Sequence, residues 1–435
     1  MRILDWQTAS SDERRAALAR PAAESRADVF AQATEIVNAV RAEGDAAIRR
    51  FSGKFGGPEL TDLRVSAGEF AAARAALDAT QIAALERAVA NVSRFHEAQM
   101  SAPLSVETMP GVVCERITRP IERVGLYVPA GSAPLPSTAI MLAAPARLAG
   151  CASRAIACPP AKDGRVQPAV LVAAQLCGVD TVYKMGGAQA IAAFAFGTET
   201  VRKVDKIFGP GSAWVTAAKQ IVAADPAGAA IDLPAGPSEV LVIADDAADA
   251  GFVAADLLAQ AEHDAIAQVV LVTTSANLAQ QVMKRVAEQM SGLSRIAILT
   301  QSMANARFII AKDLDEAVAI SNDYAPEHLI VQTRAPRALL PKVTCAGSVF
   351  LGAWSPESIG DYCSGTNHVL PTYGYARSYS GVSLLEFQKR ITVQELSADG
   401  LRALGPTAVT LSDLEGLDAH GNAVKVRLAA LGARA

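Results

Sequence analysis

Four of the five histidines in the sequence stand in polar contexts that could hold a metal ion or move a proton. Gln260 and His263 are three positions apart at the end of a predicted helix, so their side chains lie on one helix face. Glu327 precedes His328 in the turn that opens a predicted strand. The other two histidines lie in the loop ESIGDYCSGTNHVLP, which contains Asp361 and His368, and in the segment LDAHGNAVKV, which contains His420.

A set of Gln, His and Asp ligands without cysteine is typical of a borderline divalent metal such as Zn²⁺ in a site with open positions. Taken singly, however, each of these residue types is more often a hydrogen-bonding or solvated side chain. The sequence has no HExxH or CxxC motif, so spacing alone leaves both interpretations open. We expect His96, in the amphipathic segment NVSRFHEAQM, to be structural.

Two glycine-containing segments, KMGGAQAIAA and KIFGPGSAWVT, each lie between a predicted strand and a predicted helix, where a helix N-terminus could face a phosphate. Neither matches GxGxxG, and no GxxxxGK[ST] motif occurs, so tight turns account for these glycines better. A cysteine nucleophile is a competing chemistry for aldehyde oxidation. We expect Cys151 and Cys158 to be buried packing residues instead, because they lie in or beside apolar runs.

The composition excludes several classes of partner. Lys+Arg number 40 and Asp+Glu 44 in 435 residues, a net charge of −4, and aromatic residues make up only 5%, so we expect neither nucleic acid nor an anionic membrane as a partner. The most apolar stretch, AIMLAAPARLAG, is well short of the ~20 residues that span a bilayer. Six scattered cysteines and the absence of a signal-peptide pattern predict a cytoplasmic protein.

The elements that must position these residues follow from hydrophobic periodicity. The first hundred residues have helical spacing, and from Arg123 short apolar runs alternate with helical ones, a pattern typical of βαβ units. The sequence predicts an α/β protein with two Rossmann-like, incomplete parallel-sheet domains and helical N- and C-terminal arms. The expected parts are a helical arm over 1–22, a discontinuous main domain over 23–127 and 236–382, an inserted α/β domain over 128–235 and a helical tail over 383–435.

Several long motifs resemble the histidinol dehydrogenase family and follow its order from Arg123 onward. They are RVGLYVPAGSAPLPST, GGAQAIAAFAFGTE, VDKIFGPG, IDLPAGPSEVLVIAD, DLLAQAEHD, YAPEHLIVQT, AGSVFLGAWSPESIGDYCSGTNHVLPTYGYAR and FQKRITVQEL. The resemblance implies an oxidoreductase of histidine biosynthesis that oxidises L-histidinol through L-histidinaldehyde to L-histidine. It further implies one Zn²⁺ per subunit and the reduction of two NAD⁺ in a four-electron reaction.

The resemblance also assigns residues by position. The implied zinc ligands are Gln260, His263, Asp361 and His420, and the implied catalytic pair is Glu327 and His328. The implied substrate contacts are these six residues together with Ser238, His368 and Glu415, and the implied NAD contacts are Tyr127, Gln189 and Ser212.

Chemistry suggests a role for each member of the catalytic pair. A neutral imidazole suits removal of the hydroxyl proton, so we assign that role to His328, and Glu327 is then the base that activates water for the aldehyde step. Neighbouring residues on a strand point to opposite faces, so the Ala-Pro turn before them must bend the backbone. One position departs from the family, which reads GPGN where this chain has Ser212. We expect cofactor binding weaker by on the order of 1 kcal/mol.

Because Glu415 and His420 lie in the tail, the resemblance implies a homodimer in which each tail completes the partner subunit's site. Three other functions compete with this one. The first is a paralogue of the same fold that oxidises another small primary alcohol, and the second is a zinc hydrolase that uses Glu327 to activate water without a redox step. The third is a non-catalytic metal-binding or assembly protein, which the presence of both Glu327 and His328 beside a full ligand set disfavours.

Overall fold

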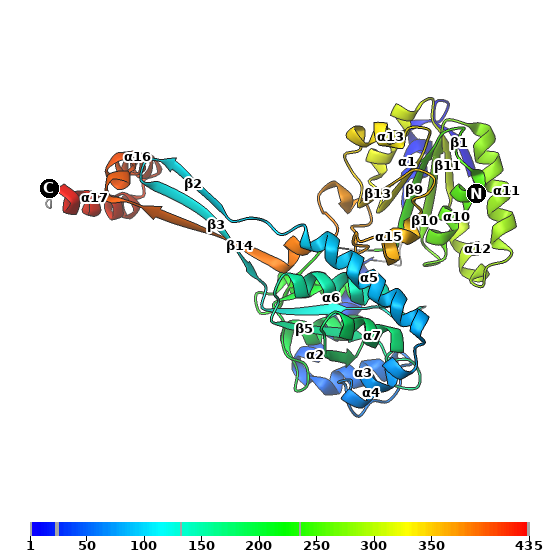
Figure 1. Ribbon diagram of the computed structural model, residues 1–435, viewed down its shortest axis with the longest axis horizontal. Helices are drawn as coiled ribbons and strands as arrows, with labels where there is room; N and C mark the ends of the chain where they lie inside the picture. Colours follow the sequence, from blue (N-terminus) through cyan, green and yellow to red (C-terminus); the bar gives the residue numbers. More distant parts are fainter. Residues whose placement is uncertain (1, 22–25, 131–132, 235, 433–435) are drawn as a thin grey trace. The chain divides into compact units, whose positions relative to one another are not determined.

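The structure is a computed structural model that describes residues 2–21, 26–130, 133–234 and 236–432. It comprises two compact units. The first contains Met1–Gln99 and Ile121–Phe387, and the second contains Met100–Pro120 and Gln388–Ala435. The first unit carries two parallel sheets, and the second carries one antiparallel sheet (Figure 1).

The larger parallel sheet has six strands in the order β1-β11-β10-β9-β12-β13. Their bounds are β1 Arg2–Asp5, β9 Glu239–Ala244, β10 Gln268–Thr273, β11 Arg307–Ile310, β12 His328–Gln332 and β13 Ser348–Leu351. The helices of this part are α1 Ser11–Leu18, α10 Ala250–Ala261, α11 Ala276–Met290, α12 Ile296–Ala304, α13 Leu314–Tyr324, α14 Pro336–Leu339 and α15 Glu357–Tyr362, with the 3₁₀ turn η1 Leu340–Lys342.

Strand β9 lies at the centre of this sheet and every one of its residues is buried, as expected for a parallel strand covered on both faces. Val240 and Val242 pack with residues of α10, α11 and α12, whereas Leu241 and Ile243 pack with residues of α1 and α13. Helix α10 begins where Asp249 accepts hydrogen bonds from two backbone N–H groups and ends at Ala261.

The second parallel sheet has five strands in the order β6-β5-β4-β7-β8. Their bounds are β4 Arg123–Tyr127, β5 Ser153–Cys158, β6 Thr181–Lys184, β7 Lys206–Phe208 and β8 Ala230–Ile231. Its helices are α2 Arg26–Glu43, α3 Asp45–Lys54, α4 Ala67–Ala75, α5 Ala79–Glu97, α6 Pro136–Leu148, α7 Pro168–Leu176, α8 Gly187–Phe196 and α9 Ala213–Ala224. Val124 and Leu126 pack with α5, α6 and α7 on one face, and Tyr127 packs with α2, α8 and α9 on the other. The 3₁₀ turns η2 Tyr375–Arg377 and η3 Leu384–Phe387 complete the unit.

The second unit is built on an antiparallel sheet in the order β14-β3-β2. Its elements are β2 Leu104–Met109, β3 Val112–Pro120, β14 Gln388–Leu396, α16 Ala398–Glu415 and α17 Asp418–Gly432. The Ser397 side chain accepts a hydrogen bond from the Gly400 N–H at the start of α16, and Gly416 ends the helix in the left-handed conformation, with φ 70°.

The expected fold class, two parallel sheets with a helical C-terminus, is confirmed. Three local expectations were wrong. Residues 2–5 of the expected helical arm form edge strand β1, and β4, expected in the main domain, belongs to the second sheet. Residues 104–120 and 388–396, expected as helical or unassigned, pair as antiparallel strands.

The helices of residues 26–97, expected in the main domain, supply residues to the cores on both faces of the second sheet. The sequence could not assign β4 to one sheet, because the run that follows Arg123 is buried and apolar and such a run is typical of a strand in either sheet. The expected boundaries of separately folding domains stay a prediction. No helix within the described ranges combines the length and the apolar character that crossing a membrane requires.

Candidate active site

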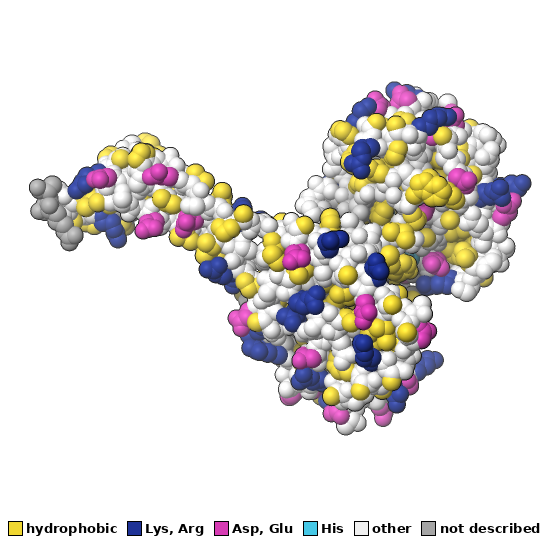
Figure 2. All heavy atoms as spheres, viewed as in Figure 1, with side chains coloured by type: hydrophobic (Ala, Val, Ile, Leu, Met, Phe, Trp, Pro, Cys, Tyr) yellow, Lys and Arg dark blue, Asp and Glu magenta, His cyan; other side chains and the backbone are white. Residues whose placement is uncertain are grey.

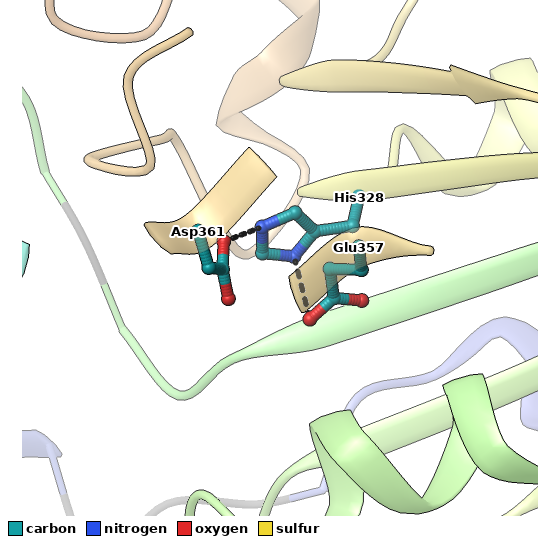
Figure 3. Close-up of side chains that lie close together, drawn as sticks. All are labelled: His328, Glu357 and Asp361. Atoms are coloured by element: carbon teal, nitrogen blue, oxygen red, sulfur yellow. Dashed lines mark ion pairs between the residues drawn. The ribbon is translucent and has the colours of Figure 1, made fainter. Parts of the chain in front are cut away.

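A cluster of buried polar side chains lies at the amino-terminal ends of β9 and β12. Glu239 begins β9 and His328 begins β12, and the two strands are direct neighbours. The last turn of helix α10 carries Gln260 to this place, and the short helix α15 brings Glu357 and Asp361 to it (Figure 3). Reactive groups of open α/β sheets more often lie at the carboxyl ends, so this edge could not be assumed from topology.

The His328 ring is held between carboxylates, with Asp361 on one side and Glu357 on the other (Figure 3). Its Nδ1 lies 3.1 Å from the backbone carbonyl oxygen of Glu239, which can only accept, so Nδ1 carries a proton. Its Nε2 is buried, lies 3.5 Å from Asp361 Oδ1 and has no hydrogen-bond partner among the described residues. Nε2 is therefore the nitrogen available to take a proton in the neutral ring.

The neighbouring carboxyl group of Glu327 is also buried. Its Oε2 accepts a hydrogen bond of 2.9 Å from the Glu239 N–H and lies 3.7 Å from His328 Nδ1. The expected bend is present, because Ala325 adopts the left-handed conformation with φ 53° and Glu327 comes before the first strand residue. The two side chains therefore reach one site instead of opposite faces of the sheet.

Burial and mutual proximity shift the acidities of this cluster. Burial raises the pKa of Glu327 to about 8, although His328 opposes the shift. Burial alone would lower the pKa of His328, but Glu357, Glu327 and Asp361 outweigh it and raise that pKa well above its ordinary value. Burial also raises the pKa of Glu357. Three carboxyl groups surround one imidazole in a buried site, so the local charge is negative and binding of a cation there is favourable.

Gln260 has no exposed surface. With its amide in the orientation that satisfies its neighbours, the nitrogen donates to Glu357 Oε1 and the oxygen accepts from the Glu239 N–H at 2.9 Å. His263 follows the last turn of α10 and is exposed. Desolvation by the surrounding protein lowers the pKa of His263, and the negative charge of the nearby Asp361 opposes this shift.

His368 and Ser238 flank the same cluster. His368 Nδ1 lies 2.8 Å from the backbone carbonyl oxygen of Asp361, and its Nε2 lies 3.0 Å from the Thr138 hydroxyl on α6. Ser238 is half-buried and directly precedes Glu239. The structure thus brings together seven of the nine residues expected to contact metal or substrate. The remaining two, Glu415 and His420, are exposed residues of the second unit, at the end of α16 and in the first turn of α17.

Sequence reasoning missed Glu357 and Glu239. The side-chain oxygens and nitrogens of His328, Glu357 and Asp361 come within 4.8 Å of one another, so these three residues could hold a cation. Glu357 stands four positions before Asp361, the spacing of one helix face, and this signal could have found it. No sequence motif marks Glu239, which contacts Glu327 and His328 through its backbone N–H and carbonyl groups.

The residues expected to contact the dinucleotide lie around the amino-terminal ends of α8 and α9. The Tyr127 hydroxyl accepts a hydrogen bond of 3.1 Å from the Gly187 N–H. Gln189 is 5% exposed, and its Oε1 has no partner within the described part of the chain. Ser212 precedes α9 but does not cap it with its side chain. A cavity of about 350 Å³ is lined by both Gln189 and Ser212 together with Gly186, Gly187, Pro159 and Trp214.

Two expectations about residues outside the site are confirmed. His96 is fully buried, and its Nδ1 lies 2.8 Å from the carbonyl oxygen of Val92. Cys151 and Cys158 are fully buried, and burial raises the pKa of their thiols to about 11 and about 12. Neither thiol is an accessible thiolate nucleophile near neutral pH.

Parallel sheets with a buried histidine–carboxylate site and a separate cavity at two helix N-termini define an α/β enzyme of the acid–base type. Residues 19–428 match the histidinol dehydrogenase family profile. The chain is 56% identical to histidinol dehydrogenase of Vibrio cholerae over 428 residues, 98% of each chain, and 55% identical to that of Vibrio vulnificus over the full length of both. A crystal structure of histidinol dehydrogenase from Elizabethkingia anophelis superposes with a TM-score of 0.94, 46% identity and 99% coverage of each chain.

The chain therefore belongs to the histidinol dehydrogenase family, a family of NAD-dependent oxidoreductases.

Proposed function

We propose that this protein oxidises L-histidinol through L-histidinaldehyde to L-histidine, with Zn²⁺ and two NAD⁺. The observation that carries the proposal is the dyad at the start of β12. His328 presents an unpartnered Nε2 while its Nδ1 is engaged by the Glu239 carbonyl, and Glu327 lies beside it. Full-length similarity to enzymes named histidinol dehydrogenase supplies the substrate.

In the first oxidation, His328 Nε2 accepts the proton of the substrate hydroxyl. The aldehyde that results has no second hydride to give until water adds to it. His328 Nε2 releases this first proton to solvent before the second oxidation. Glu327 then accepts a proton from the attacking water, and the vacated His328 Nε2 accepts the hydroxyl proton of the hydrate. The buried site keeps other water away from the aldehyde.

The residues at hand suit a zinc ion. Gln260, His263 and Asp361 would supply ligands from this subunit, and His420 would be the fourth. The carboxyl groups around His328 raise its pKa, and the same negative charges favour a bound cation. When bound, Zn²⁺ orients the amine and imidazole nitrogens of the substrate and supplies positive charge that draws the pKa values of neighbouring groups down. His368, Ser238 and Glu415 would complete the contacts to the substrate.

The residues around α8 and α9 suit NAD. Gln189 Oε1 is a buried acceptor without a partner, and it lines a cavity with the exposed side chain of Ser212. Tyr127 fixes the start of α8 through Gly187. When bound, NAD⁺ accepts the hydride in each oxidation.

We also propose a cytoplasmic homodimer in which each tail completes the partner's site. Apolar side chains flank both halves of the proposed ligand set. Trp354, Ile359 and Tyr362 are 86%, 49% and 59% exposed near Asp361, and Leu414 and Leu417 are 79% and 42% exposed near Glu415. Such exposed apolar side chains are typical of an interface. Figure 2 shows positive and negative side chains interspersed on the face in view.

The test is incubation of the purified protein with L-histidinol and excess NAD⁺, with and without a chelator. We expect about two NADH per histidinol consumed, and we expect the chelator to abolish the reaction. A ratio near one would mean that the aldehyde escapes. No NADH formation by the zinc-loaded protein would reject the proposal and favour a hydrolase or an oxidoreductase of another alcohol.

A further inference from the structure

A buried ion pair ties the N-terminal segment to the candidate active site. Arg20 donates to both carboxylate oxygens of Glu239, from Nε at 2.5 Å and from Nη2 at 2.8 Å. Side-chain exposure is 15% for Arg20 and 2% for Glu239, so the pair is shielded from water. The guanidinium also lies 4.2 Å from the centre of the Tyr324 ring.

The same guanidinium reaches the turn that precedes the dyad. Arg20 Nη2 donates to the carbonyl oxygens of Tyr324 at 2.8 Å and Ala325 at 3.4 Å. Ala325 is in the left-handed conformation, which alanine adopts only at a cost, so contacts on its carbonyl help to retain it. This conformation directs Glu327 and His328 into one site.

Glu239 in turn orients both members of the dyad through its backbone. Its N–H donates to Glu327 Oε2 at 2.9 Å, and its carbonyl oxygen faces His328 Nδ1 at 3.1 Å. A third contact, from the Tyr373 N–H to Glu239 Oε1 at 2.8 Å, fixes the carboxylate from another side. One guanidinium therefore restrains the start of β9 and the turn before β12 together.

We infer that Arg20, through its paired contacts with Glu239 and with the Tyr324–Ala325 carbonyls, is a positioning residue for the Glu327/His328 dyad. The inference rests on the proposed function only in assigning acid–base roles to the dyad. Lysine cannot reproduce the arrangement, because a single ammonium lacks the planar fork that spans a carboxylate and two carbonyls.

The test compares Arg20→Lys with Arg14→Lys. Arg14 is the matched control. It donates from Nε at 3.0 Å and from Nη2 at 2.6 Å to the Trp6 carbonyl oxygen and lies 5.2 Å from the Trp6 ring centre, and within the described residues it makes no hydrogen bond to the dyad. We expect Arg20→Lys to lower kcat by about 10- to 100-fold with little change in the KM for NAD⁺, because displacement of a base by an ångström has effects of this size. In Arg20→Lys, the rate of oxidation of added histidinaldehyde should fall by at least as large a factor as the rate of oxidation of histidinol.

Arg14→Lys should show a similar change in Tm and an unchanged kcat. Glu239→Gln is a second variant that weakens the same contacts and keeps the side-chain size. The double variant Arg20→Lys/Glu239→Gln should lose no more kcat than the stronger single variant, because both act on one clamp.

Unchanged kcat in folded Arg20→Lys, or equal losses of kcat in Arg20→Lys and Arg14→Lys, would overturn the inference. The inference would also be overturned if the fold-loss of kcat in the double variant equalled the product of the fold-losses in the two single variants. The wild-type control separates the two proposals. Wild-type protein that makes no NADH from histidinol contradicts the proposed function. Active wild-type protein with an equally active Arg20→Lys variant contradicts only the positioning role of Arg20.

Discussion

The two nitrogens of His328 have different surroundings, and this difference decides what the residue can do. Nδ1 faces a backbone carbonyl, which fixes the proton there, and Nε2 is left as the basic position. A histidine that used both nitrogens in hydrogen bonds, as His368 does with Asp361 and Thr138, would be poorly suited to take up a proton. The contrast between these two histidines lies in contacts that no motif specifies.

Ser212 should limit cofactor binding. Its side chain neither caps α9 nor is buried, and it lines the cavity beside Gln189. Ser212→Asn adds an amide that can both donate and accept, so we expect the KM for NAD⁺ to fall by about fivefold, equivalent to one hydrogen bond of about 1 kcal/mol. Steady-state kinetics at saturating histidinol would measure it, and the KM for histidinol should not change. An unchanged or higher KM for NAD⁺ would contradict the prediction.

Asp256 on α10 carries a buried carboxyl that the proposed mechanism does not use. Burial raises its pKa to about 7, although a hydrogen bond of 2.6 Å from Gln332 Nε2 opposes the shift. The unfolded chain has an ordinary value near ~3.9, so the folded state holds an extra proton between these two values. The contribution of Asp256 to stability therefore falls as pH rises from about 4 to about 7 and then levels off.

Asp256→Asn removes this penalty and can still pair with Gln332, whose Oε1 has no partner within the described residues. We expect the variant to be more stable than wild type by on the order of a few kcal/mol near pH 8, and by much less near pH 5. Urea unfolding at both pH values would measure the difference. The exposed Asp323→Asn is the control, and an Asp256→Asn gain that is independent of pH would disprove the explanation.

At the scale of elements, the loop before α9 is held by a buried ion pair. Lys219 Nζ donates to the Asp232 carboxylate, to the Gly209 carbonyl at 2.9 Å and to the Leu233 carbonyl at 3.2 Å, and its side chain is 3% exposed. Asp232 also accepts from the Gly209 N–H at 2.7 Å. The pair thus connects the residue after β7, the middle of α9 and the segment after β8.

Lys219→Met should therefore cost about 3–5 kcal/mol of unfolding free energy, because it leaves a buried carboxylate unpaired. Lys284→Met is the control, since Lys284 is 79% exposed in its pair with Glu288, and it should change stability by less than about 0.5 kcal/mol. Chemical denaturation would measure both. Restoration of stability in Lys219→Met/Asp232→Leu would support the explanation, and equal effects of the two single variants would refute it.

The parallel sheets could be predicted because buried parallel strands such as β9 are continuous apolar runs between helical segments. Strand β2 could not, because all but one of its residues are exposed and no alternation marks a buried face. In the same way, Gln260 with His263 was visible as a helix-face pair, whereas Arg20 and Glu239 are 219 positions apart and meet only after folding. Local periodicity carries the first kind of information, and only tertiary packing carries the second.

At the scale of the whole molecule, the proposed ligand set is divided between the two units of the chain. Gln260, His263 and Asp361 belong to the first unit, and His420 belongs to the second. Apolar side chains such as Leu414 are exposed on the second unit, and Figure 2 shows apolar side chains over the surface formed by β2, β3, β14, α16 and α17. A partner subunit that covers them would also bring a tail to each site.

Mixed dimers can test this arrangement directly. If tails are exchanged, a dimer of one His328→Ala subunit and one His420→Ala subunit has one site with both defects and one site with neither. We expect about half the wild-type turnover per dimer, since one of two sites is intact, although each variant alone is inactive. Subunits with different affinity tags, co-expressed and purified in two steps, would supply the mixed dimer for an NADH assay.

The reciprocal pairing gives the opposite expectation. A dimer of wild-type and His328→Ala/His420→Ala subunits should be inactive with exchanged tails, because the intact first unit receives the defective tail and the intact tail serves the defective first unit. With each tail serving its own subunit, the results reverse, and this second dimer keeps about half of the activity whereas the first has none. The two dimers contain the same substitutions in the same number, so a difference in folding or metal content cannot account for activity in only one of them.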